Sequence, residues 1–311
     1  MKNISVLLFL LITLALNAQN NKTSGLNARQ FHKYWKVESE SPDYKVTFLG
    51  DTVEILSPKG LTLWRKEKMS GKVTIEYDAC VVVEVEGDRL SDLNCFWMAS
   101  DPQYPDNIWK REKWRSGIFL NCYSLQLYYM GYGGNHNSTT RFRRYDGNEA
   151  AITNAKARPA ILKEYTDADH LLEANKWYHI KITNENNRVS YYINGVRLVD
   201  FRDAAPLTEG WFGFRTTLSR TRIANFHYEC SPQEISEIPL HWIGNTPQQD
   251  RTVSLGVPFS EGELYPENTL QLITDRGETL PIDTWVLAYW PDGSVKWNGI
   301  AGVIPGNTDK L

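Results

Sequence analysis

The chain has 311 residues, with 37 acidic and 34 basic side chains and a formal net charge of -3. So small a negative charge creates no positive field for a polyanion, which excludes nucleic acid as an expected partner. Aromatic residues make up 12% of the chain, including 11 Trp and 16 Tyr. Two explanations of this aromatic content stay open, namely an aromatic β-sheet core and flat rings that stack on the apolar faces of sugars.

The first residues have the order of a secretory signal peptide. A short basic start is followed by an almost wholly apolar stretch over residues 4–16, and Ala18 offers a small residue for cleavage. At about 1.5 Å per residue the apolar stretch reaches only about 20 Å, short of the roughly 30 Å core of a bilayer. We therefore expect a signal peptide over residues 1–18, cleavage near Ala18, a periplasmic or extracellular protein and no membrane span.

Almost every periodic segment in residues 19–230 alternates between apolar and polar side chains with period two, which is typical of half-buried strands. In residues 73–85 every odd position is apolar, while most even positions carry charged or polar side chains. Asn194-Gly195 is the signal for a type I′ hairpin turn. Further strands are predicted over residues 44–49, 52–56, 93–98, 125–132, 177–183, 188–193, 211–216 and 221–229. Since no amphipathic helix interrupts them, we predict an all-β jelly-roll β-sandwich.

The chain changes character after residue 230. Residues 231–249 contain three prolines and no periodicity, which predicts a linker. Residues 250–311 return to β patterning, with strands expected at 251–257, 285–290 and 295–300. About sixty residues of sheet provide little core of their own, so we expect an incomplete second β-domain.

The four cysteines, Cys80, Cys95, Cys122 and Cys230, are widely spaced and form no Cys-x-x-Cys or Cys/His pattern. An oxidising compartment permits disulfides, but Cys80 and Cys95 lie in apolar strand patterns that are equally compatible with buried free thiols. We expect no cofactor and no metal held by sulfur. A structural calcium ion stays possible.

The densest polar cluster lies in the middle of the first domain. Alternation places Asp92 and Asn94 on the open face of one strand, and Arg141, Arg143 and Tyr145 on one face of another. Two guanidinium groups on one face repel each other unless an anion lies between them. Because guanidinium matches carboxylate bidentately, that anion is either Asp92 or the carboxylate of a uronic acid.

This cluster contains the groups that β-elimination of an acidic polysaccharide requires. The reaction needs a cation that neutralises the uronate carboxylate, a base for the C5 proton and an acid for the leaving oxygen. Tyr128, His136, Arg141 and Arg143 are the catalytic candidates, and the candidate sugar contacts are Asp92, Asn94, Asn137 and Tyr145. The alternative is structural, because Arg–Asp pairs often tie loops to sheets and a His in a Gly/Asn loop is often a turn residue.

Two tryptophans and two aspartates remain to be assigned. Trp109 and Trp114 lie in a polar stretch and are either sugar platforms or caps on the core. Asp88 and Asp92 would lie about 13 Å apart in an extended segment, beyond the roughly 5–10 Å between the two carboxylates of a glycoside hydrolase. Lyase chemistry therefore ranks above hydrolysis.

Five motifs in residues 30–230 occur together, at residues 60–64, 88–99, 131–135, 139–145 and 210–216. With them the segment resembles an uncharacterised bacterial domain family of secreted polysaccharide-utilisation proteins. This resemblance implies a concanavalin-like fold but no known activity.

Residues 255–259, 262–264 and 287–297 resemble the N-terminal β-domain of exo-rhamnogalacturonan lyase-like proteins. This second resemblance implies that the partner is a pectic or other uronate-bearing polysaccharide or oligosaccharide. Two hypotheses follow: a protein that cleaves an acidic glycan, with lyase chemistry first, or a non-catalytic carbohydrate-binding module of a truncated lyase-like protein.

Overall fold

The computed structural model describes residues 24–231, 238–260, 263–266, 268–291 and 293–311. The expected signal peptide, with its cleavage site near Ala18, lies outside these residues. The chain divides into two compact units, with the boundary between residues 232 and 233 and with residues 202–206 grouped with the second unit. Within the described ranges, no helix has the length and apolar character needed to cross a bilayer.

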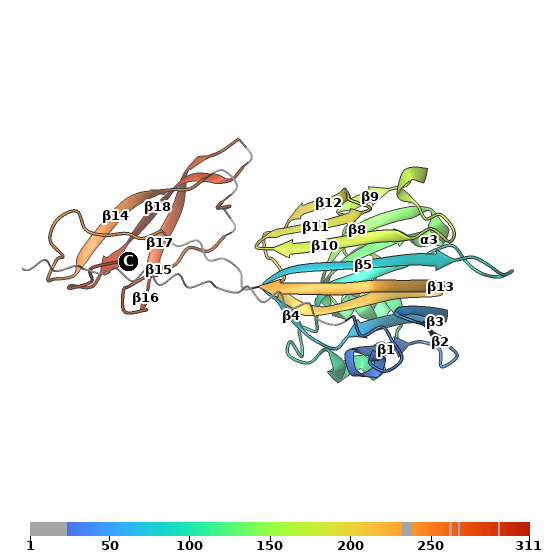
Figure 1. The fold of residues 1–311 in the computed structure, drawn as a ribbon. Coiled ribbons are helices and arrows are strands. Elements are labelled where there is room, and N and C mark those ends of the chain that lie inside the picture. The colour runs from blue at the N-terminus through green and yellow to red at the C-terminus, as the bar shows by residue number, and fades with distance from the viewer. Residues whose placement is uncertain (1–23, 232–237, 261–262, 267, 292) are drawn as a thin grey trace, which may run out of the picture. The chain divides into compact units, whose positions relative to one another are not determined.

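The first unit is a single antiparallel sheet folded into two layers, because two long strands pass through both. These strands are β3 (Thr52–Arg65) and β13 (Glu209–Ser231), which pair along most of their length (Figure 1). The first layer has the order β1 (Trp35–Ser39), β3, β13, β6 (Leu93–Ser100), β7 (Gln126–Gly133), β8 (Thr139–Asp146), β9 (Lys163–Tyr165). The second layer has the order β2 (Lys45–Leu49), β3, β13, β5 (Lys72–Val82), β10 (Tyr178–Glu185), β11 (Arg188–Ile193), β12 (Val196–Arg202). The short β4 (Met69–Ser70) pairs with the start of β13.

Strand β13 changes layers at a β-bulge. Its register against β3 shifts between Thr217 and Ser219, and Leu218 between them has a left-handed φ of 49°. Before the bulge β13 pairs with β6, and after it β13 pairs with β5. A bulge adds a residue and bends the strand, so this one feature connects the two halves of the sandwich.

The alternation of side chains gives the first layer two apolar faces. Trp97 and Tyr128 point into the core between the layers, where Trp97 stacks on Tyr191 of the second layer at 6.2 Å. Phe96 and Tyr129, their neighbours in sequence, point to the outer face. Short helices pack on that outer face: η1 (Ile108–Arg111), α2 (Glu112–Arg115), η2 (Phe119–Ser124), α4 (Ala150–Thr153) and η3 (Ala155–Ala157). The remaining helical turns are α1 (Phe31–Tyr34), α3 (Gly134–Asn137) and η4 (Ala168–His170).

The prediction of an all-β jelly-roll sandwich is confirmed, and the differences from it are local. The two strands expected at residues 211–216 and 221–229 are one strand, β13, and the strand expected at 52–56 continues to Arg65. Asn194 and Gly195 have φ values of 49° and 82°, as the predicted type I′ turn between β11 and β12 requires.

The second unit is built on a three-stranded sheet in the order β14 (Arg251–Pro258), β18 (Val295–Ile304), β17 (Ile282–Tyr289). A hairpin of β15 (Leu272–Ile273) and β16 (Thr279–Leu280) accompanies it. Leu240 exchanges two backbone hydrogen bonds with Leu311, and Trp242 Nε1 donates to the carbonyl of Thr308 at 2.9 Å. From Leu240 onward the chain therefore belongs to this unit, and the linker expected over residues 231–249 is wrong for that part. That the second domain is incomplete stays a prediction.

Candidate functional site

A groove of about 440 Å³ opens on the outer face of the first layer, beside the part that the short helices cover. Its floor is a row of residues that lie opposite one another on neighbouring strands. Arg215 of β13 pairs with Asn94 of β6, Asn94 with Gly131 of β7, and Gly131 with Arg141 of β8. The sheet register therefore brings together polar side chains from β13, β6 and β8, three strands that are distant in sequence, with Gly131 of β7 between Asn94 and Arg141.

The groove carries an excess of positive charge. Five arginines line it, against two carboxylates: Arg89, Arg141, Arg143, Arg158 and Arg215, with Glu40 and Asp92. An aromatic wall formed by Phe119, Tyr123, Tyr129 and Tyr145 completes the lining. A groove with this balance favours a ligand that is anionic and has apolar surface to stack.

Three of the arginines are held in place by hydrogen bonds to neighbouring residues. Arg141 donates through Nε to Glu164 at 2.5 Å, and Arg143 donates to the carbonyl of Pro159. Arg215 is only 3% exposed and donates to the carbonyl of Gly117 at 2.5 Å. Because a guanidinium has five N–H groups, Arg141 and Arg143 keep donors for a ligand.

Asp92 and Asn94 form the acidic end of the floor. The Asp92 carboxylate accepts hydrogen bonds from the Ser91 hydroxyl at 2.8 Å and from Asn94 Nδ2 at 3.2 Å, and it pairs with Arg89 at 3.2 Å. Asp92 has a left-handed φ of 64°, which turns its carboxylate toward these partners. The arrangement uses Asp92 to hold Arg89 and Asn94 in place.

Tyr129 lines the groove, and its hydroxyl lies directly over Gly131. A Cβ atom on Gly131 would meet the Tyr129 hydroxyl oxygen at 2.5 Å, so only glycine lets the ring lie there. Among the described residues, none forms a hydrogen bond with this hydroxyl. Burial, together with the nearby Asp92 carboxylate, raises the pKa of Tyr129 above its ordinary value. The phenol therefore stays protonated at neutral pH, and its hydroxyl can donate a hydrogen bond.

His136 reaches the groove from an unusual turn. Asn135, His136 and Asn137 have consecutive left-handed φ values of 51°, 57° and 57°, within the segment named α3. The Asn137 side chain holds this turn, donating to the carbonyl of Leu172 at 2.9 Å and accepting from its N–H at 2.8 Å. Strained backbone of this kind is commonly found at functional sites.

The segment that supplies Phe119 and Tyr123 is anchored by buried ion pairs. Arg115 is fully buried and donates to Glu38 of β1 at 2.9 Å, while Arg111 pairs with the buried Asp101 at 2.7 Å. Burial raises the pKa of Glu38, although Arg115 opposes this effect. Removing one partner of a buried pair costs about 3–5 kcal/mol, so these pairs hold the aromatic wall firmly against the sheet.

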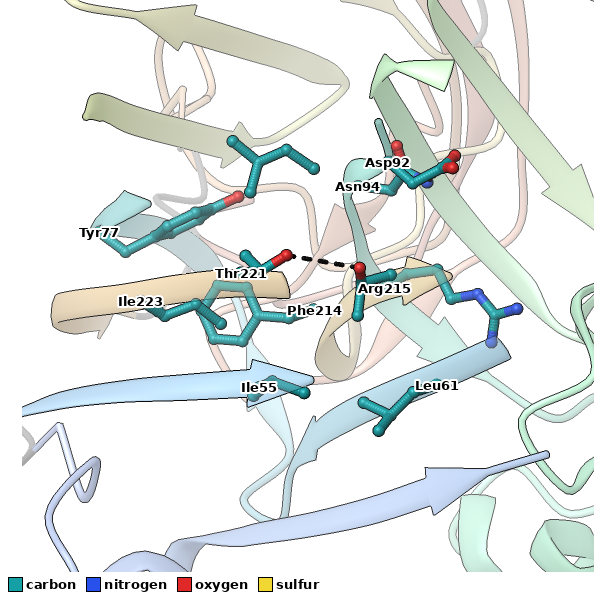
Figure 2. Close-up of a pocket in the computed structure, with 11 residues that line it drawn as sticks. Ile55, Leu61, Tyr77, Asp92, Asn94, Phe214, Arg215, Thr221 and Ile223 are labelled. Atoms are coloured by element: carbon teal, nitrogen blue, oxygen red, sulfur yellow. Dashed lines mark hydrogen bonds between the residues drawn. The ribbon is translucent and has the colours of Figure 1, made fainter. Parts of the chain in front are cut away.

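A cavity of about 10 Å³ lies at the end of the floor, next to the layer-switching bulge. Figure 2 shows Asn94 and Arg215 at one end of it and the apolar Tyr77 and Phe214 at the other. The Thr216 hydroxyl lies 3.4 Å from that of Thr221 across the bulge. The cavity is too small for a sugar, so it belongs to the fold and not to the ligand site.

Five of the expected site residues line the groove together, namely Asp92, Asn94, His136, Arg141 and Arg143, and the buried Tyr145 forms part of its wall. The structure thus brings together side chains from the end of the β5–β6 loop, from β6, from the turn between β7 and β8, and from β8.

The expected place of Tyr128 on the open face is wrong. Its side chain is fully buried between the layers, and its hydroxyl accepts a hydrogen bond from the N–H of Leu207 at 3.1 Å. Residues 125–132 carry mostly apolar side chains on both sides of the strand, so alternation alone did not show which side faces the groove. Tyr129, one residue later, provides the phenol that sequence reasoning assigned to Tyr128.

Three expected sugar contacts lie elsewhere. Both polar atoms of the Asn137 amide are bonded to Leu172, so this residue holds the turn and does not line the groove. Trp109 lines a different cavity, and Trp114 is 44% exposed with its ring 5.0 Å from Arg111.

Several groove residues were not singled out from the sequence: Glu40, Arg89, Phe119, Tyr123, Tyr129, Arg158 and Arg215. Arg215 lies within the motif at residues 210–216, next to the core residue Phe214. Because neighbouring side chains on a strand point to opposite faces, this alternation could have placed Arg215 on the outer face. Arg158 lies in a loop, where no periodicity marks its direction.

The described cysteines are free thiols, and the described acidic residues are not grouped as metal ligands. Cys80, Cys95 and Cys122 are buried thiols without a disulfide, and burial raises the pKa of Cys95 to about 12 and that of Cys122 to about 11. In the part of the chain that the structure describes, no three His, Cys, Asp or Glu side chains gather as metal ligands.

Two families match different parts of the chain, as the sequence motifs predicted. Residues 55–226 match the domain of unknown function DUF6250, and residues 236–310 match the PcRGLX-like N-terminal RIFT barrel domain. The uncharacterized protein YetA of Bacillus subtilis (strain 168) is 34% identical over 71 residues, which are 23% of this chain and 8% of that protein. The chain therefore spans a small fraction of that relative's length.

Solved structures agree with the fold of the first unit. A Bacillus subtilis protein of unknown function with a galectin-like fold has a TM-score of 0.53 at 14% identity, covering 68% of this chain and 95% of its own. The carbohydrate-binding module CBM66 from Bacillus subtilis has a TM-score of 0.42 at 17% identity, covering 63% of this chain and 94% of its own. The first match shows a galectin-like sandwich, of the same lectin-like kind as the expected concanavalin-like fold. Since the matched family region covers more than half of the chain, this protein belongs to the DUF6250 family.

Proposed function

We propose that the first unit binds an acidic polysaccharide in the groove on its outer face. The observation that carries this proposal is the lining itself, in which five arginines face two carboxylates beside an aromatic wall. A uronate has a carboxylate for the guanidinium groups and apolar ring faces for the aromatic side chains. Arg141 and Arg143, adjacent on one face of β8, are the residues that pair with the carboxylate.

The second unit supports the same ligand class. Its match to the PcRGLX-like domain agrees with the resemblance of residues 287–297 to exo-rhamnogalacturonan lyase-like proteins, which act on uronate-bearing pectic chains. Export to the periplasm or cell exterior, where such polymers are found, is part of this proposal. A structural calcium ion stays a prediction.

A second candidate function, β-elimination in the same groove, is favoured by the unbonded, protonated hydroxyl of Tyr129. In this reaction Arg141 and Arg143 neutralise the carboxylate and His136 removes the C5 proton. The C4–C5 double bond forms as the C4–O4 bond breaks, and Tyr129 donates its proton to the departing oxygen. This assignment replaces Tyr128 by Tyr129 and keeps the other three catalytic candidates.

The test is binding to uronate polymers, compared with binding to a neutral glucan, by retention in a gel that contains each polysaccharide. We expect retention on the uronate polymers only, and Arg143→Ala to weaken it about 10–100-fold, the effect of losing a charged hydrogen-bonded pair. Arg188→Ala, on the exposed side of β11, is the matched control. Equal retention of the Arg143→Ala and wild-type proteins would refute binding in this groove.

Ultraviolet absorbance of the same mixtures separates the two candidate functions. Elimination creates a double bond conjugated with the carboxylate, which absorbs where the substrate does not. Rising absorbance that Tyr129→Phe abolishes without unfolding the protein supports the lyase. Retention without any rise in absorbance leaves a binding module.

A further inference from the structure

A second open cavity of about 390 Å³ lies in the first unit, outside the groove. Three aromatic and three basic side chains line it: Trp35, Tyr44 and Trp109, with His32, Lys36 and Lys66. No carboxylate is among its lining residues, so this Trp109 pocket has the same ligand preference as the groove.

The side chains of the Trp109 pocket are held in position by contacts outside it. Trp109 lies in the first turn of η1, where its N–H donates to the Asn107 side chain at 3.1 Å, and its ring packs edge-on against Trp211 at 6.2 Å. Lys36 pairs with Glu112 and lies 5.4 Å from the Trp109 ring. A ring that is fixed before binding loses little side-chain entropy when a ligand stacks on it.

Lys66 supplies the least neutralised charge of the pocket. Its Nζ donates to the backbone carbonyl of His32 at 2.5 Å, which is a neutral acceptor. An ammonium group has three N–H donors, so two remain for an anionic ligand.

Strand β1 connects the Trp109 pocket to the groove. Lys36, Glu38 and Glu40 alternate onto one side of the chain; Lys36 lines the pocket, and Glu40 lines the groove. Four residues of extended chain separate them by about 13 Å. Between them on this side lies Glu38, which is buried beneath Arg115 and Gly117 and accepts a hydrogen bond from each.

We propose that the Trp109 pocket is a second carbohydrate site that binds a further stretch of the same acidic polymer. A pyranose ring packs against Trp109 and Tyr44, and its carboxylate pairs with Lys66. The inference rests on the proposed function of the groove and extends it to two sites on one chain. Two linked sites raise the affinity for a long polymer above that for a short oligomer.

The experiment is calorimetric titration of the whole protein with two probes, a galacturonate trimer and polygalacturonate. Trp109→Ala and Lys66→Glu are compared with Trp114→Ala and Lys113→Glu, matched changes at exposed side chains outside both sites. We expect the pocket variants to bind the polymer about 10–100-fold more weakly, while binding of the trimer to the groove stays within about twofold of wild type. The controls keep wild-type affinity for both probes.

Each other outcome has a distinct meaning. Unchanged polymer affinity in Trp109→Ala and Lys66→Glu would overturn the second site while leaving the groove intact. A folded variant that binds neither the trimer nor the polymer would also overturn the second site. The substitution would then have disturbed the groove, and the pocket would not be a separate binding site. If Trp109→Ala fails to fold, the exposed Lys66→Glu decides alone. Wild-type protein that binds neither probe refutes the proposed function itself.

Discussion

The turn that presents His136 concentrates backbone strain at single residues. A left-handed conformation costs a residue with a Cβ atom roughly 1–2 kcal/mol, although Asn tolerates it better than most. His136 lies between two Asn residues, so it bears the largest share of this cost. The backbone strain is thus found at His136, whose imidazole lines the groove.

His136→Gly is therefore expected to raise the free energy of unfolding by up to about 1 kcal/mol, because glycine adopts this conformation without strain. The same change removes the imidazole and should weaken ligand binding. Denaturant unfolding and the gel retention assay measure the two effects. Asn186→Gly, at a left-handed position in the β10–β11 turn, should leave binding unchanged. A stability gain without any loss of binding would show that His136 does not contact the ligand.

Gly131→Ala tests the position of the Tyr129 ring. The added Cβ would lie 2.5 Å from the Tyr129 hydroxyl oxygen and 2.9 Å from its Cζ, so the ring must move. We expect a loss of about 1–3 kcal/mol in stability, typical of overpacking, together with weaker ligand binding. Gly134→Ala is the control, since a Cβ there meets nothing nearer than 3.7 Å. Equal stability of the two variants would contradict the described packing.

The loop between β5 and β6 contains Asp92, which lines the groove. Asp88 stabilises the conformation of this loop through hydrogen bonds. The Asp88 carboxylate accepts hydrogen bonds from the N–H groups of Glu84 at 2.9 Å and Val85 at 3.1 Å, and from Arg220 at 2.6 Å. Burial would raise the pKa of Asp88, but these donors together lower it below its ordinary 3.8. A carboxylate with a lowered pKa in the folded state stabilises the fold only while it is ionised.

The stabilisation by Asp88 is thus complete above its unfolded pKa of 3.8 and is lost as the pH falls through the lower folded value. Asp88→Asn should cost about 1–2 kcal/mol at pH 7, and the difference from wild type should shrink below pH 3.8. Denaturant unfolding at a series of pH values measures it. Asp51→Asn, at an exposed position in the β2–β3 turn, is the matched control. If the loss of stability in Asp88→Asn did not change with pH, the ionised Asp88 carboxylate would not be what stabilises the fold.

At the scale of the whole molecule, each unit has its own apolar core. The clusters around Trp97 and around Phe96 lie in the first unit, and that around Val257 lies in the second. Each groove-lining residue and each Trp109-pocket residue belongs to the first unit. Stability and ligand binding of the first unit should therefore be separable from the second.

A protein of residues 24–231 is expected to unfold in a single cooperative transition and to bind the galacturonate trimer with the affinity of the whole chain. Thermal unfolding and titration calorimetry check both properties. Failure of this shorter protein to fold would show that the first unit depends on the second.

Much of the fold was predictable because strands are marked by local alternation. The period-two pattern of residues 73–85 and the Asn194-Gly195 turn each depend on near neighbours in sequence. The groove arginines Arg141 and Arg143 were found in the same way, since alternation on one strand puts them on one face. By contrast, alternation within β13 indicated two strands, since the bulge at Leu218 resets the pattern.

The sequence by itself determined the all-β sandwich, the two-family organisation and the shared face of Arg141 and Arg143, because these depend on short-range periodicity and on local motifs. Only the tertiary structure decided which tyrosine faces the groove, that Arg215 joins its floor, and that Trp109 lines a separate pocket. These depend on strand register and on which face the helices cover. Both are set by packing between segments far apart in the chain, for which local periodicity carries no signal.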